Sequence, residues 1–242
     1  MGLVEQWGVP LAVLGMLLAT LFMAAVVKRH QVYRAQVRVR VQRLEHGIQV
    51  INNALDGLRP VPLSRELRVM LRGEILARLQ LIARLYRRYP QVRERIVSAE
   101  SALNAEGAPT GAGVGPIEDD KMFRRIVHAI DEVIDVLEHS ATVQPLPRDV
   151  NQIFRRELGE RRAEVNARFH LVQSMKLRRA GDMTRGRAHL TTLLHVLRKR
   201  GPSTDFVREL YAEAETALQS LTTASLAGAG EGKNAGVGSD AA

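Results

Sequence analysis

The sequence predicts an all-α protein with a single transmembrane helix at the N-terminus, then a juxtamembrane helix and two units of the helical-hairpin type joined by a flexible linker. Three observations predict it. Residues 9–27 are apolar apart from Thr20, and a run of this length crosses a bilayer as a helix. Apolar residues then recur at helical spacings of three and four, and no stretch alternates as a strand would. Residues 104–116 and 227–242 are rich in Gly and Ala without any apolar period, which is typical of a linker and of a disordered tail.

The predicted anchor, residues 9–27, carries basic residues on one side only. Glu5 is the one charged side chain before it, whereas a cleaved signal peptide has its basic residues before the apolar run. Because basic flanks stay on the cytoplasmic side, residues 1–8 are expected outside and the body in the cytoplasm. Much Arg, Ala and Gly is typical of a GC-rich bacterial source, in which case the membrane is the inner one.

The segment after the anchor predicts contact with anionic lipid head groups. Residues 28–100 hold sixteen Lys and Arg against six Asp and Glu, a net charge of +10, whereas residues 119–226 hold eighteen against fifteen, a net of +3. Each basic residue near an anionic surface contributes about 1 kcal/mol. If this segment leaves the membrane as a rod, the lipids reach only its first charges; if it lies on the surface, they reach all. The lipid-proximal residues are Lys28, Arg29, Arg34, Arg38, Arg40 and Arg43.

A heptad-like seam begins within this basic segment. Apolar residues recur at spacings of four and three, a pattern that favours a rod and allows pairing with a second copy as a coiled coil. Residues 59–62 contain two prolines and end the helix. The seam consists of Val37, Val41, Leu44, Ile48, Ile51, Leu55 and Leu58.

Two helical units follow the anchor, a membrane-proximal one over residues 28–103 and a distal one over residues 117–226. In the first, Ser64 is expected to cap a helix and Pro90 to start another. In the second, a Gly-Asp pair predicts the end of one helix and the start of the next. The residues expected to cap the distal helices are Asp119 or Asp120, Asp149, Asp182 and Ser203.

The two units share a trace of repetition. Residues 92–103 and 207–218 are identical at seven of twelve positions, and each segment follows a basic helix end and a proline. The match indicates either two related helical hairpins or the common composition of Ala- and Glu-rich helices.

Motifs of catalysis are missing from the sequence. The chain has no cysteine, which excludes thiolate nucleophiles and thiolate metal sites. It has neither G-x-S-x-G nor S-x-x-K, and the glycines of residues 111–115 lead into Pro116 rather than into the Gly-Lys-Ser/Thr of a phosphate loop. We therefore expect no enzyme and no cofactor.

One metal-dependent alternative lies on the helix predicted over residues 117–139. At helical spacing its polar face gathers two imidazoles and two carboxylates, although a solvated polar face has the same composition. These residues are His128, Glu132, Asp135 and His139. Four further histidines, His46, His170, His189 and His195, are isolated in sequence and are expected to be surface or packing residues.

A cluster of arginines between residues 155 and 168 is interleaved with acids. Glu157–Arg161 and Glu164–Arg168 have i,i+4 spacing, so the cluster predicts a salt-bridged solvent face rather than a nucleic-acid surface.

These observations favour a membrane-anchored cytoplasmic adaptor or scaffold that presents helical faces to a protein partner. The alternative is a tether for nucleic acid through residues 28–100. It lacks a recognition motif and a stacking platform, since Tyr33, Tyr86 and Tyr89 are scattered in the sequence.

Overall fold

The computed structural model describes residues 3–86, 89–107, 113–138, 143 and 145–234, with side chains from residue 15 to residue 223 of these ranges. They form seven helices and no strand, which confirms the all-α prediction for the described chain. The helices are α1 (Leu3–Gly57), α2 (Arg65–Leu85), α3 (Val92–Asn104), α4 (Asp120–Glu138), α5 (Arg148–Arg179), α6 (Met183–Arg200) and α7 (Asp205–Asn234).

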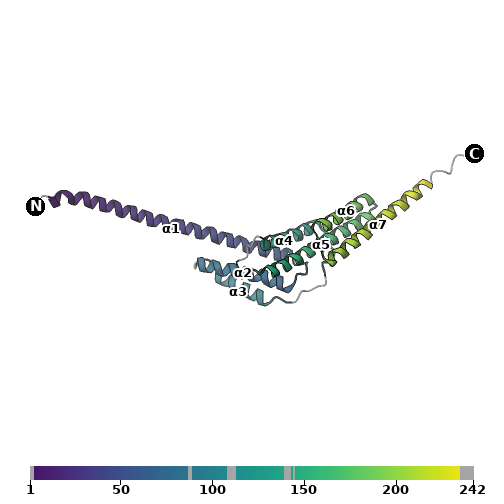
Figure 1. Cartoon of the computed structure of the whole chain (residues 1–242), viewed down its shortest axis with the longest axis horizontal. Coiled ribbons are helices and arrows are strands. Elements are labelled where there is room, and N and C mark those ends of the chain that lie inside the picture. The colour runs from purple at the N-terminus through teal and green to yellow at the C-terminus, as the bar shows by residue number, and fades with distance from the viewer. Residues whose placement is uncertain (1–2, 87–88, 108–112, 139–142, 144, 235–242) are drawn as a thin grey trace, which may run out of the picture.

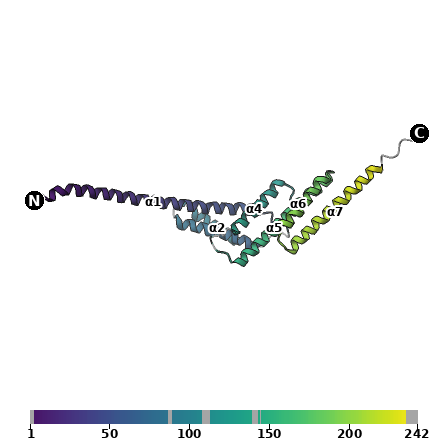
Figure 2. The same ribbon diagram turned by 45° about the horizontal axis from the view of Figure 1, so that its top comes forward.

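The molecule is elongated. The first half of α1 projects alone from a body built by the remaining helices, and the two termini lie at opposite ends (Figure 1). A second view shows the same projection (Figure 2). The predicted anchor and the juxtamembrane helix are thus parts of one helix, and the basic segment leaves the apolar residues as a rod rather than bending away from them.

Along this projection, residues 15–36 are all exposed. Within the part of the chain that the structure describes, none of the helices combines the length and the apolar character needed to cross a membrane. The anchor predicted over residues 9–27 is not confirmed, and its residues 9–14 lie outside the described side chains.

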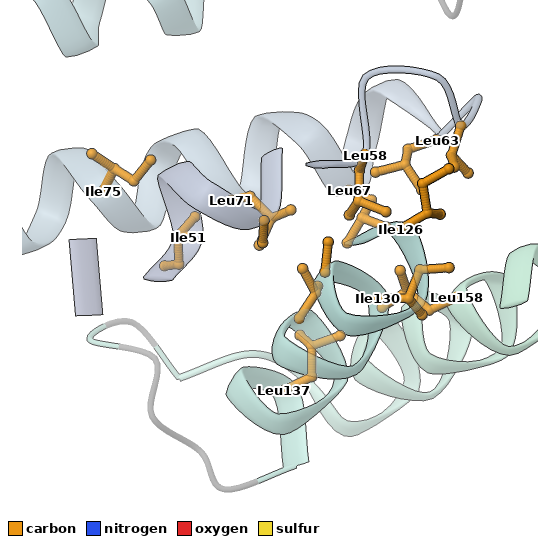
Figure 3. Close-up of a cluster of buried hydrophobic side chains, with 14 of the residues drawn as sticks. Ile51, Leu58, Leu63, Leu67, Leu71, Ile75, Ile126, Ile130, Leu137 and Leu158 are labelled. Carbon is orange, nitrogen blue, oxygen red and sulfur yellow. The ribbon is translucent and has the colours of Figure 1, made fainter. Parts of the chain in front are cut away.

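The seam of α1 packs against the protein's own helices. Ile51 and Leu58 are buried against α2 residues such as Leu67 and Leu71, and α4 supplies Ile130 to the same cluster (Figure 3). Helices of the same chain therefore cover the predicted seam, and a second copy could pair here only by displacing α2 and α4. An apolar heptad pattern predicts that a helix face is buried, but it does not predict which helix covers that face.

The two predicted units contribute residues to the same main hydrophobic cluster. The main cluster joins α1, α2, α4 and α5, and a smaller cluster joins α5 to α6 and α7. The matching segments of residues 92–103 and 207–218 each lie in the second helix of a hairpin, α2–α3 and α6–α7. Helix α5, which reaches both clusters, ties the two hairpins together.

Most expected helix boundaries are confirmed, and two caps are corrected. The Ser64 hydroxyl accepts from the Leu67 N–H at 3.2 Å, and Asp182 caps α6 by accepting from the Arg185 N–H at 3.0 Å. Gly181 before it has φ +80°, a conformation that favours glycine. Pro147 rather than Asp149 precedes α5, and Thr204 rather than Ser203 caps α7, accepting from the Val207 N–H at 3.4 Å.

The described parts of the predicted linker and of the predicted tail are both more ordered than their composition indicates. At the ends of the predicted linker, the Glu106 carboxylate pairs with Arg68 and Val114 is buried, donating its N–H to Glu164 at 2.9 Å. Helix α7 continues to Asn234, into the predicted tail, because its Ala residues sustain a helix despite the glycines. Residues 108–112 and 235–242 lie outside the described residues.

Two glycines offer a matched test of the packing. A Cβ on Gly57 would lie 2.9 Å from the Ala129 Cβ where α1 meets α4, whereas one on Gly73 would meet nothing within 4 Å. Gly57→Ala is expected to lower the free energy of unfolding by about 1–3 kcal/mol through overpacking. Gly73→Ala is expected to raise it by up to about 1 kcal/mol, because Ala is the better helix former. Urea unfolding of the full chain in detergent measures both, and equal effects would contradict the close approach of α1 to α4.

Candidate functional site

A groove of about 780 Å³ runs beside α1, where the exposed projection meets the body. One side is a stripe along α1 from His30 to Gln49, and the other is the connection between α2 and α3. The helical rise makes the α1 stripe about 30 Å long. The lining residues are His30, Tyr33, Arg34, Val37, Arg38, Val41, Gln42, Glu45, His46, Gln49, Leu85, Tyr86 and Tyr89.

Three tyrosines that are scattered in the sequence gather along this groove. Tyr33 comes from α1 and is exposed, while Tyr86 and Tyr89 come from the α2–α3 connection and form an edge-to-face pair with centroids 6.3 Å apart. Between them the floor is apolar, since Val37 and Leu85 pack against the main core. The groove therefore offers aromatic rings with hydroxyl tips over an apolar floor.

The charge of the groove is positive because its acid is neutralised. Glu45 is the only acidic residue among the described residues that line the groove, and it accepts two hydrogen bonds from Arg95 of α3, at 2.6 and 3.1 Å. The Arg95 hydrogen bonds hold the pKa of Glu45 below its usual value. Burial, together with its hydrogen bond to Glu45, raises the pKa of Tyr89. Among the described lining residues, the charges left to act on a ligand are those of Arg34 and Arg38.

The structure separates the six predicted lipid-proximal residues into two sets. All six are exposed on α1, but only two line the groove. Lys28, Arg29, Arg40 and Arg43 lie on α1 outside the lining. The residues that the sequence does not link to this site are Tyr86, Tyr89 and Arg95, since no local pattern brings the α2–α3 connection back to α1.

A second basic surface lies where α5 meets the α6–α7 turn. It is a cleft of about 870 Å³. Six of its lining residues are basic: Arg148, Arg155, Arg156, Arg162, Lys199 and Arg200. Arg155 pairs with Glu138, Arg156 with Glu160 and Arg162 with Asp131. The other three form no ion pair within the described part of the chain, so the cleft keeps an excess of three positive charges.

The expected salt-bridged face of α5 forms in part, since Glu160 pairs with Arg156 at i,i+4 spacing, but two other acids of this helix also bind residues outside it. Glu157 accepts from the Ser64 hydroxyl at 2.7 Å, and Glu164 is buried, accepting from Arg161 at 2.8 Å and from Val114. The predicted pairs Glu157–Arg161 and Glu164–Arg168 do not form. Glu157 binds Ser64 instead, and Glu164 binds Val114 together with Arg161 of its own helix. Helical spacing alone does not reveal such partners.

The metal alternative gains no support on α4. His128 lies 3.4 Å from Glu132 and is mostly exposed. Within the described residues, no group of three or more potential ligands lies close enough to hold a metal. His139 lies outside the described residues.

Two histidines that are isolated in sequence meet in the core. The Nδ1 atoms of His170 and His189 lie 3.0 Å apart, and both rings contact Phe169, which stacks on Phe123 at 4.1 Å. Burial, with a smaller contribution from His189, lowers the pKa of His170 to about 4. The hydrogen bond needs at least one neutral ring.

This pair predicts acid sensitivity. Because the pKa of His170 is about 4 when folded and about 6.5 when unfolded, protonation favours the unfolded chain, and stability is lost as the pH falls below 6.5. Between pH 7 and pH 5 the loss is about 2 kcal/mol. Urea unfolding of the full chain at both pH values checks it. His170→Leu should remove this difference, and a variant that keeps the full pH dependence would contradict the assignment.

Comparison with known proteins yields no relative. No family model, no curated protein and no solved structure matches the chain. The features that bear on function are therefore the exposed helix, the groove and the cleft.

Proposed function

We propose that this protein is a single-pass, membrane-anchored cytoplasmic adaptor that holds a helical body near the membrane and presents it to a protein partner. The observation that carries the proposal is the course of α1. One helix passes from an exposed apolar stretch, through an exposed basic stretch, into the hydrophobic core.

The apolar stretch supports the anchor. Leu17, Leu21 and Phe22 are exposed by 54–72%, and the apolar residues from 15 to 27 cover every face of the helix. Such a surface is unfavourable in water and favourable in hydrocarbon. Residues 15–27 extend about 20 Å by helical rise, and the apolar residues 9–14 lengthen the run to about 28 Å, close to the hydrocarbon thickness of a bilayer.

The rod sets the distance of the body from the membrane. Val41 is the first buried residue after the exposed stretch, and it lies fourteen positions beyond Val27. The helical rise places the start of the core about 20 Å beyond the end of the apolar run. An adaptor of this geometry holds its hydrophobic core about 20 Å from the hydrocarbon of the bilayer.

The Arg-rich cleft supports the choice of an acidic partner segment. Arg148, Lys199 and Arg200 are exposed and are free of ion pairs within the described residues. Complementary charge steers association and adds specificity. A partner whose docking segment carries several Asp or Glu residues fits this surface.

Cross-linking in membranes tests the adaptor proposal with the full chain. Lys199→Glu with Arg200→Glu reverses two charges in the last turn of α6. The matched control, Arg178→Glu with Arg179→Glu, reverses two in the last turn of α5, outside the cleft. We expect the cleft variant to lose a specific cross-linked partner that the wild type and the control retain. A wild type that captures no specific partner, or a partner lost equally from both variants, would contradict the proposal.

A further inference from the structure

We infer that the groove beside α1 binds the head group of one anionic phospholipid. The inference rests on the proposed membrane anchor, and it names the ligand of a site formed jointly by α1 and the α2–α3 connection.

The position of the groove suits a lipid phosphate. By helical rise from Val27, His30 lies about 4–5 Å and Arg34 about 10 Å beyond the hydrocarbon. The polar layer of a bilayer extends about 5–7 Å beyond the hydrocarbon on each side. Helical side chains point back toward the N-terminus, and here that direction is toward the membrane. The guanidinium of Arg34 can therefore reach the phosphate layer.

The charges of the groove select an anion. Arg34 and Arg38 are one helical turn apart and line the same wall, so two guanidinium groups can bind one phosphodiester. Glu45 does not oppose the anion, since Arg95 already neutralises it. A lipid of net negative charge is thus favoured over phosphatidylcholine.

The tyrosines favour a lipid over other anions. Rings with an apolar body and a polar tip are stable at the membrane–water interface. Tyr33 and Tyr86 both line the groove and are exposed. The groove also begins on the same helix as the apolar stretch, three residues beyond its end. A lipid in the bilayer is therefore the nearest anion to the site.

The test compares two pairs of equal charge. Arg34→Gln with Arg38→Gln removes two charges inside the groove, and Arg40→Gln with Arg43→Gln removes two on the same helix outside it. The full chain in mild detergent is titrated with dioctanoyl phosphatidylglycerol, and binding is followed by native mass spectrometry. Because each basic residue contributes about a factor of five near an anionic ligand, the groove pair should weaken binding about 10- to 30-fold. The outer pair should change it less than about threefold.

Further ligands distinguish the source of the phosphate. We expect one phosphatidylglycerol per chain, little binding of dioctanoyl phosphatidylcholine, and weak binding of inorganic phosphate or glycerophosphoglycerol. Tyr86→Ala should also weaken lipid binding, since it removes an aromatic ring from the groove without removing a charge. The inference would be overturned if both arginine pairs weakened lipid binding equally, or if the two lipids bound with equal affinity. It would also be overturned if inorganic phosphate bound as well as the lipid, or if a single-stranded oligonucleotide bound more tightly.

Alkaline carbonate extraction of membranes that contain the full chain distinguishes failure of the groove assignment from failure of the proposed anchor. If the wild type stays in the membrane but the groove variants bind lipid normally, only the groove assignment fails. If the wild type is extracted, the anchor itself fails.

Discussion

Glu74→Ala should lower the free energy of unfolding by about 3–5 kcal/mol, because it breaks a buried ion pair. Glu74 and Arg78 are both 4% exposed and lie 3.3 Å apart on α2. The Glu74 carboxylate also accepts from the Val143 N–H, and the Arg78 guanidinium packs against Gly47 of α1. Burial lowers the pKa of Arg78, and the charge of Glu74 opposes that change. The variant removes the carboxylate that pairs with this buried guanidinium.

Urea unfolding of the full chain in detergent measures the effect. Glu66→Ala, in the exposed first turn of the same helix, is the matched control and should cost less than about 1 kcal/mol. Replacing the pair together, with Glu74→Ala and Arg78→Met, should recover part of the loss, since neither charge of this pair then remains in the core. A loss below about 1 kcal/mol for Glu74→Ala would contradict the role of the pair.

Leu17→Arg together with Leu21→Arg should release the protein from the membrane. Across residues 9–27 the apolar side chains favour insertion by about 3–6 kcal/mol, whereas each arginine at the centre of a membrane helix costs about 2.5–3.5 kcal/mol. The two charges therefore cancel the gain. The fraction of the full chain that stays with membranes after alkaline carbonate extraction measures the change.

The control places an arginine on the same helix beyond the apolar run. Val32→Arg replaces an exposed valine outside residues 9–27, so it should leave membrane retention unchanged. A Leu17→Arg, Leu21→Arg protein retained as well as the wild type would show that this stretch does not anchor the chain.

Local patterns predict the helices well, because caps and stops depend on neighbouring residues. Ser64 and Asp182 cap the helices expected of them. Partner choice is what local patterns miss. The face from Val37 to Leu58 has the spacing of a coiled coil, and its burial comes from α2 and α4 of the same chain. Glu157 has the spacing for an intrahelical pair and instead binds Ser64, 93 residues away.

The candidate site is predictable only in part for the same reason. The basic residues after residue 27 point to the membrane side of the protein, and Arg34 and Arg38 do line the groove. The opposite wall arises because the turn at residues 58–64 sends α2 back along α1, which brings Tyr86 and Tyr89 beside residues about fifty positions earlier. The His170–His189 pair depends in the same way on the packing of α5 against α6.

The course of α1 through the bilayer can be measured directly, because the chain has no cysteine to interfere with labelling. Spin labels are placed on the full chain in lipid vesicles through the single substitutions Phe22→Cys, Gln31→Cys, Gln36→Cys and Gln49→Cys. Collision with oxygen reports hydrocarbon, and collision with a water-soluble nickel complex reports water. The proposal predicts oxygen access at Phe22, a crossover near Gln31, and water access at Gln36 and Gln49. Water access at Phe22 equal to that at Gln36 would contradict the anchor.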